Sequence, residues 1–177
     1  TMAEQIDAVL GAREALLAHL ARFTVDGAPG ARIRVHGDYH LGQVLVTGHD
    51  YVIVDFEGEP GRSIGERRHK HSPLRDVAGM IRSFSYAAAF AFDKATAQRP
   101  QEQARVVPPL AAWRQATVSA FLAAYTGRMR GSVAHPGNDA TTTALLGLFV
   151  LEKTLYELRY ELDNRIDWVR IPLAGLT

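Results

Sequence analysis

The sequence predicts a mainly α-helical protein that carries one small β-hairpin, and three observations support this fold class. Apolar residues recur at helical spacing in four long segments of the 177-residue chain. Runs rich in β-branched residues are concentrated between residues 33 and 54. The apolar content of 47% and the charged content of 22% are typical of a globular domain with a substantial core. We therefore expect a single domain over residues 1–177.

The first expected helix covers residues 3–23 and ends before Gly27, Pro29 and Gly30. Charged residues lie mostly between its apolar ones, so we expect an amphipathic helix that packs against a core and carries no chemistry. Its apolar positions are Ile6, Val9, Leu10, Leu16, Leu17, Leu20 and Phe23.

Strand signals follow in three short runs, at residues 33–35, 44–46 and 51–54. The segment Thr47-Gly48-His49-Asp50 is a turn between the last two runs, which predicts a β-hairpin. A two-stranded hairpin is marginally stable on its own, so we expect it to lie on the helices.

Residues 58–72 are rich in Gly, Pro, Arg and His and show no periodicity, which predicts a loop of about 15 residues. Loops of this length are usually functional. Two interpretations of its basic residues stay open: a solvated face, or a surface that faces phosphate. These residues are Arg62, Arg67, Arg68, His69, Lys70 and His71.

Three further helices are expected, the first of which begins at Ser72-Pro73, since serine suits the N-cap and proline the first helical position. The last helix is apolar on all sides in its first half, which predicts burial. The segments are a helix to about residue 93, a polar linker ending at Pro108-Pro109, a helix over 109–130, a turn at 131–139, and a helix over 140–163 that Thr141 or a neighbour caps.

Composition excludes several classes of function. The net charge is +1, so we expect neither nucleic acid nor an anionic membrane as a partner. The chain has no cysteine, which excludes disulfides and thiolate metal sites and is compatible with a cytoplasmic location. No apolar run reaches the roughly 18 residues that a membrane-spanning helix needs.

Three polar residues around the hairpin point to a chemical site. Asp38 lies in a tight loop after a glycine, where a carboxylate can accept a proton from a substrate hydroxyl. Asp55 follows a strand, and Gln43 precedes one; carboxylate and amide oxygens are hard ligands that suit Mg²⁺. Phosphoryl transfer needs this set, so we expect a kinase or phosphotransferase site that uses ATP and Mg²⁺.

Two other kinds of site compete with this one, a zinc site and a serine hydrolase site. His36, Asp38 and His40 have a spacing that could serve zinc, but no remote ligand completes the set and Gly37 points to a tight loop. A serine hydrolase needs a G-x-S-x-G elbow, and the sequence has none. We therefore expect His36 and His40 to support the loop through hydrogen bonds.

The segment His36-Gly37-Asp38-Tyr39-His40, with Gln43 and with Asp55-Phe56-Glu57 after it, resembles the catalytic loop and metal-binding triplet of the aminoglycoside phosphotransferase-like kinases. Those kinases share the protein-kinase fold. Residues 72–80 and 151–165 are further similar to the maltokinases, which make maltose 1-phosphate and in some relatives are fused behind a trehalose synthase. The resemblance covers the chain from about residue 30 to its end and implies a helical, kinase-like C-terminal lobe.

The resemblance implies roles for single residues. Asp38 corresponds to the catalytic aspartate, which takes or orients the proton of the anomeric hydroxyl of maltose or a related sugar. Asp55 corresponds to a Mg²⁺ ligand, and Gln43 stands where the family at large has a ligating asparagine. Glu57 replaces a glycine and could add a second carboxylate. Asp76 corresponds to a residue that braces the catalytic loop by accepting backbone N–H bonds.

The sugar site is expected on the last helix. Tyr156 and Tyr160 are four residues apart and share a helix face, which Glu152 and Arg159 flank. Aromatic rings stack on sugars while charged groups bond hydroxyls, although the same residues could pack and form ion pairs within the helix. Trp168 has the same ambiguity, and core packing is favoured for it.

A kinase also needs a nucleotide lobe, with a glycine-rich strand loop and a strand lysine paired with a helix glutamate. The residues before His36 contain neither. We therefore expect the chain to correspond to the C-terminal lobe, without the N-terminal nucleotide lobe and inactive alone. The alternative is a non-catalytic sugar-binding or structural module attached to a trehalose synthase.

Overall fold

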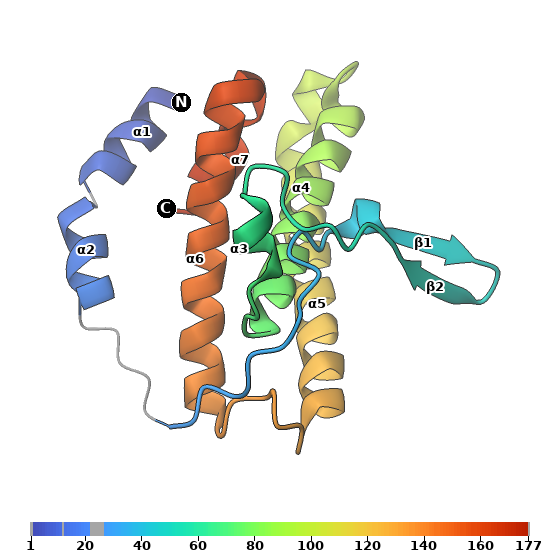
Figure 1. Cartoon of the computed structure of the whole chain (residues 1–177). Helices are drawn as coiled ribbons and strands as arrows, with labels where there is room; N and C mark the ends of the chain where they lie inside the picture. The colour runs from blue at the N-terminus through green and yellow to red at the C-terminus, as the bar shows by residue number, and fades with distance from the viewer. Residues whose placement is uncertain (1, 12, 22–26, 177) are drawn as a thin grey trace. The chain divides into compact units, whose positions relative to one another are not determined.

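The computed structural model describes residues 2–11, 13–21 and 27–176 (Figure 1). The described residues are mostly helical and include a two-stranded antiparallel sheet, which confirms the predicted fold class at this level. The chain forms two compact units, one made of Thr1–Pro29 and Pro136–Thr177 and the other of Gly30–His135. Among the described residues, no helix combines the length and apolar character needed to cross a membrane.

The terminal segments build the first unit, in which α7 contacts both α1 and α6. Val169, Ile171 and Leu173 are buried there. The short helices after residue 164 were not predicted. The elements are α1 (Met2–Gly11), α2 (Arg13–Ala21), α6 (Asp139–Asn164), the 3₁₀ helix η3 (Ile166–Trp168) and α7 (Arg170–Leu173).

The expected helix over residues 3–23 is confirmed where α1 and α2 are described, whereas residues 12, 22 and 23, and with them Phe23, lie outside the described residues. Its predicted burial is wrong at three positions. Ile6, Leu10 and Leu17 are 39%, 64% and 46% exposed, because these faces of α1 and α2 remain open to solvent.

The helix expected over 140–163 is confirmed as α6, and its cap is Asn138. The Asn138 side-chain oxygen accepts the Thr141 N–H at 2.7 Å, the bond that an N-cap residue supplies to the free donors of the first turn. The predicted burial on all sides is wrong. Leu145 is buried but Gly147 is exposed, so one face of the helix stays in solvent.

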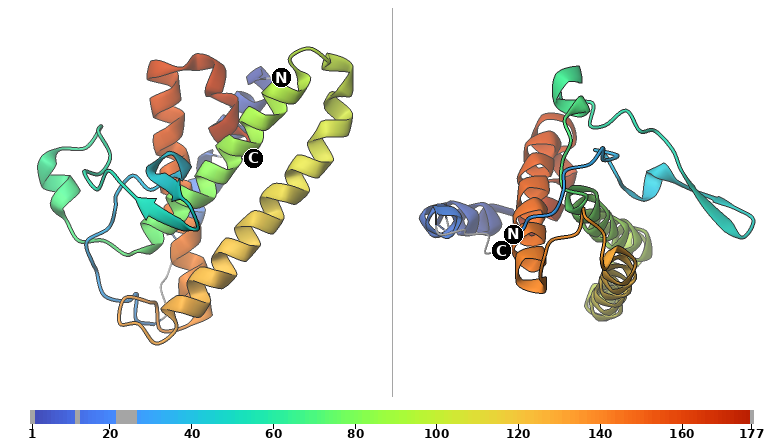
Figure 2. Two further views of the ribbon diagram at one scale, coloured as in Figure 1. Left: turned by 90° about the vertical axis from the view of Figure 1, so that its right-hand side faces the viewer. Right: turned by 60° about the horizontal axis from the view of Figure 1, so that its bottom comes forward.

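Two long helices, α4 (Leu74–Thr96) and α5 (Gln103–Met129), run side by side in the second unit (Figure 2). The Phe84 ring meets Trp113 and Phe121 edge-on, with ring centroids 6.5 and 5.8 Å apart. This geometry is favourable for aromatic pairs and joins the two helices. The first turns of α4 are the centre of this unit, since Leu74, Val77, Ala78 and Met80 are buried.

The polar linker expected before residue 109 is largely wrong. A 3₁₀ turn, η2 (Pro100–Glu102), leads directly into α5, which continues through Pro108 and Pro109. Proline has a helical φ, but inside a helix it lacks the N–H donor and its ring crowds the carbonyl four residues earlier, so α5 continues through this pair at a local cost. The short helical turn expected in this segment corresponds to η2.

The predicted hairpin is confirmed as β1 (Val44–Thr47) and β2 (Asp50–Ile53), paired from Val44↔Ile53 to Thr47↔Asp50. The expected strand at 33–35 is reduced to one bridge between Ile33 and His71. The expectation that the hairpin lies on helices is wrong: Val46 is 72% and Tyr51 68% exposed, and Figure 1 shows the strands extending away from α4.

Residues 58–72 hold a short helix, α3 (Ile64–Arg68), where the sequence predicted an irregular loop. A capping box explains it. The Glu66 N–H donates to the Ser63 hydroxyl at 3.3 Å, and the Ser63 N–H donates to the Glu66 carboxylate at 2.9 Å. The hydrogen bond from the Ser63 hydroxyl is the main cause that holds the pKa of Glu66 below its usual value.

We predict that Ser63→Ala loosens α3 and leaves the long helices intact. Amide exchange at Glu66, measured by NMR, should accelerate about fivefold because the N-cap acceptor is lost. Ser119→Ala is the matched control, because Ser119 is exposed inside α5 and alanine suits a helix interior. Equal protection of Glu66 in both variants would contradict the capping role.

The same box predicts a pH dependence of α3. A carboxyl group whose folded pKa is lowered stabilises the fold above its unfolded pKa, and this contribution is lost as the pH falls through the folded value. In the wild type, the protection of the Glu66 amide should therefore decline at pH below its usual carboxyl pKa. In Ser63→Ala the same titration should change protection much less.

Candidate functional site

The candidate site is built around the loop of residues 36–43, which lies in the second unit. His36 is buried and uses both ring nitrogens: Nε2 is 2.7 Å from the Val54 carbonyl, and Nδ1 accepts the Asp38 N–H at 3.3 Å. The partners assign Nε2 as the donor and Nδ1 as the acceptor, because a carbonyl only accepts and an amide only donates. His36 thus ties the backbone of Asp38 to the residue before Asp55.

Gln43 makes a second link between the same two segments. Its backbone carbonyl accepts the Val54 N–H at 3.0 Å, and its side-chain Nε2 donates to the Asp55 carboxylate at 2.7 Å. The structure therefore brings together Gln43 and Asp55, which are 12 residues apart in the sequence. The orientation of the amide follows from this hydrogen bond.

Asp55 has a strained backbone. Its φ is 64°, and among the described residues it is the one non-glycine residue with a positive φ. Such a conformation costs on the order of 1–3 kcal/mol and persists where surrounding contacts enforce it. The bonds to Val54 from His36 and Gln43 fix the chain immediately before Asp55, which accounts for its persistence here.

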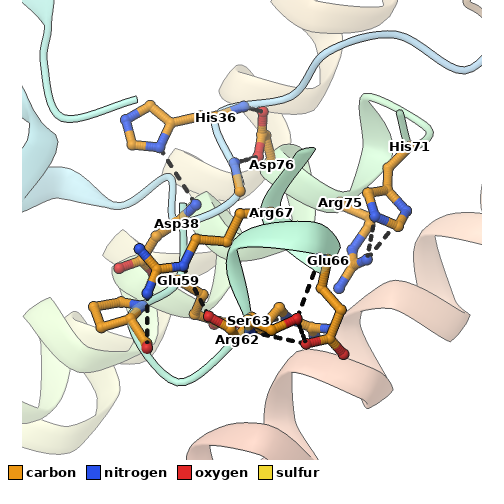
Figure 3. Close-up of polar contacts among 12 residues, drawn as sticks. His36, Asp38, Glu59, Arg62, Ser63, Glu66, Arg67, His71, Arg75 and Asp76 are labelled. Atoms are coloured by element: carbon orange, nitrogen blue, oxygen red, sulfur yellow. Dashed lines mark hydrogen bonds and ion pairs between the residues drawn. The ribbon is translucent and has the colours of Figure 1, made fainter. Parts of the chain in front are cut away.

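Asp76, in the first turn of α4, holds the start of the loop. Its carboxylate accepts the His36 N–H at 2.7 Å and the Gly37 N–H at 2.9 Å, on different oxygens (Figure 3). Hydrogen bonds to an ionised acceptor are stronger than neutral ones. Burial, and after it the Asp76 charge, raises the pKa of both Tyr39 and Tyr125, so these phenols stay neutral at physiological pH.

His40 supports the far end of the loop. Its Nδ1 accepts the Gly42 N–H at 3.0 Å and so caps the 3₁₀ turn η1 (Leu41–Gln43). Its Nε2 lies 3.9 Å from the Asp38 carboxylate. The zinc interpretation finds no support here, since both ring nitrogens of His36 are engaged and no group of three His, Cys, Asp or Glu side chains in the described residues could hold a metal ion.

Gln43 and Asp55 could nevertheless hold Mg²⁺ that arrives with a nucleotide. Mg²⁺ keeps several waters and takes phosphate oxygens, so one carboxylate and one amide oxygen from the protein are sufficient. The Gln43 amide would have to turn its oxygen toward the ion. Glu57 is exposed and follows Asp55 by two residues.

Part of the basic cluster in residues 58–72 has a structural role (Figure 3). Arg62 pairs with the buried Glu59 at 2.9 Å. Arg67 donates to the carbonyls of Arg62 and Pro60, each at 2.9 Å. One Arg75 nitrogen lies 3.2 Å from His71 Nδ1. The remaining cluster members Arg68, His69 and Lys70 are exposed, so both interpretations of their charge stay open.

The four residues expected to bind sugar lie on α6, in the first unit, whereas the loop of residues 36–43 belongs to the second unit. Tyr160 is 44% exposed, Arg159 is exposed, and Glu152 and Tyr156 are half-buried. The Lys153 ammonium lies 5.0 Å from the Tyr156 ring centroid. Of these four side chains, Arg159 and Tyr160 are the exposed ones.

An ion pair next to this helix face was missed by sequence reasoning. Glu161 is 1% exposed, and Arg165 donates to both of its carboxylate oxygens at 2.8 and 2.6 Å. The same guanidinium lies 5.4 Å from the Tyr160 ring centroid and 5.0 Å from that of the half-buried Trp168. The spacing of four residues between Glu161 and Arg165 was the available signal.

Comparison with known proteins gives concordant results. Residues 2–113 match the family described as the phosphotransferase enzyme family. A glucosamine kinase of Mycolicibacterium smegmatis is 34% identical over 142 residues, which are 80% of this chain and 33% of that protein. One of Streptacidiphilus jiangxiensis is 29% identical over 146 residues, which are 82% of this chain and 31% of that protein. The chain thus spans about a third of the length of these curated relatives.

Solved structures agree on the fold. A glucosamine kinase in complex with glucosamine, ADP and inorganic phosphate has a TM-score of 0.66 at 24% identity, covering 99% of this chain and 47% of that one. Crystal form B of a glucosamine kinase has a TM-score of 0.61 at 25% identity, covering 82% and 33%. The described fold is therefore similar to part of a sugar kinase.

We predict that Asp76→Asn lowers the free energy of unfolding by about 2 kcal/mol, because one charged acceptor is lost and an amide NH₂ then faces a backbone N–H. Denaturant unfolding measures this loss, and amide exchange at His36 and Gly37 should accelerate with it. Asp163→Asn, at an exposed position on α6, is the matched control and should change stability by less than about 0.5 kcal/mol. Equal stability of the two variants would refute the bracing role.

Proposed function

Because the chain belongs to the phosphotransferase enzyme family, we propose that it supplies the catalytic loop and metal-binding residues of a kinase that transfers the γ-phosphate of ATP to a sugar. One observation supports this most: His36 and Gln43 join Asp38 to Asp55 through hydrogen bonds to Val54 and to the Asp55 carboxylate. A proton acceptor is thereby connected to a pair of oxygen ligands, as phosphoryl transfer needs.

In this proposal Asp38 accepts the proton of the sugar hydroxyl, so that the hydroxyl oxygen can attack phosphorus while the bond to ADP breaks. Gln43 and Asp55 would hold Mg²⁺ through their side-chain oxygens, once the Gln43 amide has turned. Mg²⁺, when bound there, neutralises phosphate charge during transfer. His36 fixes the loop through its hydrogen bonds to Val54 and Asp38.

Maltose is the sugar that we propose, phosphorylated at its anomeric hydroxyl. Support comes from the likeness of residues 72–80 and 151–165 to the maltokinases. Glucosamine is the rival, because the curated relatives are glucosamine kinases. The α6 side chains Glu152, Tyr156, Arg159 and Tyr160 are proposed to bind the sugar, with hydroxyls on the charged groups and the ring faces on tyrosine.

We further propose that the nucleotide is covered by a lobe outside this sequence, since no glycine-rich strand loop with a paired lysine occurs before His36. A longer polypeptide that contains this chain should therefore convert maltose and ATP to maltose 1-phosphate with Mg²⁺, whereas the 177-residue chain should not. A coupled assay of ADP release measures the turnover of both polypeptides on maltose, and glucosamine is tested as the competing substrate. Turnover by the 177-residue chain alone would contradict the lobe proposal.

We predict that Asp38→Asn in the longer polypeptide lowers kcat at least a hundredfold and leaves sugar affinity nearly unchanged, because the amide cannot accept the proton. Asp50→Asn is the matched control: Asp50 lies at the hairpin turn, and the oxygen of asparagine can still accept its own bond from Tyr51 N–H. Steady-state kinetics measure kcat, and calorimetry measures the affinity for the sugar. Sugar binding without transfer in the wild type would favour the non-catalytic module.

A further inference from the structure

Helix α4 contacts the loop of residues 36–43 at three positions along one of its faces. Asp76, Gly79 and Ser83 are three and four residues apart, a spacing that places them on the same side of a helix. Asp76 accepts the N–H groups at the start of the loop. Gly79 and Ser83 meet the loop farther along, so the contacts follow each other in the same order on both segments.

Ser83 holds the end of the loop. Its hydroxyl oxygen accepts the Leu41 N–H at 3.0 Å, and Leu41 is the first residue of η1. The first N–H groups of a helical turn have no partner within the turn, so an external acceptor fixes where the turn begins. Gln43, which bonds Asp55, is the last residue of this turn.

Gly79 permits the close approach of the loop between these two points. A Cβ atom at Gly79 would lie 2.7 Å from the Tyr39 carbonyl oxygen, closer than such atoms approach in proteins. The obstacle is backbone, which cannot turn away as a flexible side chain can. Tyr39 directly follows Asp38, so any displacement of its carbonyl moves the catalytic carboxylate. The helical glycines Gly127 and Gly147, by contrast, have nothing within 4 Å of such a Cβ.

We propose that α4 is a rigid support for the loop, and that Gly79 and Ser83 are positioning residues that determine where Asp38 and Gln43 lie. The proposal rests on the proposed phosphotransferase function of this site. The first turns of α4 suit this role because Leu74, Val77 and Met80 are buried and hold the helix. Ser83 is half-buried and acts through one hydrogen bond.

The pair Ser83→Thr and Ser83→Val tests the hydroxyl at nearly constant side-chain shape. In the longer polypeptide, Ser83→Val should lower kcat about tenfold with an unchanged KM for the sugar, and Ser83→Thr should retain most of the wild-type kcat. Gly79→Ala should lower kcat at least as much, whereas Gly127→Ala should leave it unchanged. A kcat for Ser83→Val equal to that of Ser83→Thr would overturn the positioning role.

A second measurement separates this proposal from the proposed function. In the 177-residue chain, NMR should show the Leu41 amide exchanging about tenfold faster in Ser83→Val than in Ser83→Thr, at equal melting temperatures. If the wild type phosphorylates no sugar, the proposed function fails, but the exchange rates still test whether α4 supports the loop. Equal Leu41 exchange in the two variants would contradict this support whether or not the protein is a kinase.

Discussion

The carboxylate of Asp76 is the constraint on which the described site depends. It accepts two consecutive backbone N–H groups, of His36 and Gly37, and so fixes where the chain turns before Asp38. Gly37 has a φ of 86°, and a Cβ atom there would lie 3.1 Å from the Gly58 Cα. Gly58 therefore leaves little space on one side of the turn, and the Asp76 carboxylate holds the backbone on the other. Everything after it, including the His36 ring and its bond to Val54, takes its place from this anchor.

Hydrogen bonds to the backbone hold the site, together with contacts of the His36 ring with Tyr39 and Phe56, whose ring centroids lie 5.6 and 4.8 Å away. The side chains of His36, from the loop, and Asp76, from α4, together bond four backbone groups: the N–H groups of His36, Gly37 and Asp38 and the carbonyl of Val54. Such a network orders the loop while the neighbouring hairpin remains exposed on both faces. Exposure of Val46 and Tyr51 is therefore compatible with an ordered site. The hairpin only connects Gln43 to Asp55 along the chain, whereas the loop holds side chains of the candidate site.

Local patterns predicted the long helices, the two hairpin strands and the group of polar residues around them, because each has a clear period or a β-branched run. Other features depend on contacts that are distant in sequence. The partner of His36 is Val54, 18 residues away, and no local signal selects that carbonyl. The strained φ of Asp55 has the same origin. Two misses were avoidable: Ser63 and Glu66 have the spacing of a capping box, and helical apolar spacing continued before Pro108.

A double-mutant cycle on kcat tests most directly whether Asp76 acts through Asp38. Asp76→Asn, Asp38→Asn and the double variant would be compared in the longer polypeptide by single-turnover phosphate transfer at saturating sugar and ATP. We predict that Asp76→Asn lowers the rate when Asp38 is present and has little further effect once Asp38 is asparagine, since residues that act as a unit are not additive. An equal factor in both backgrounds would show that Asp76 does not act through Asp38.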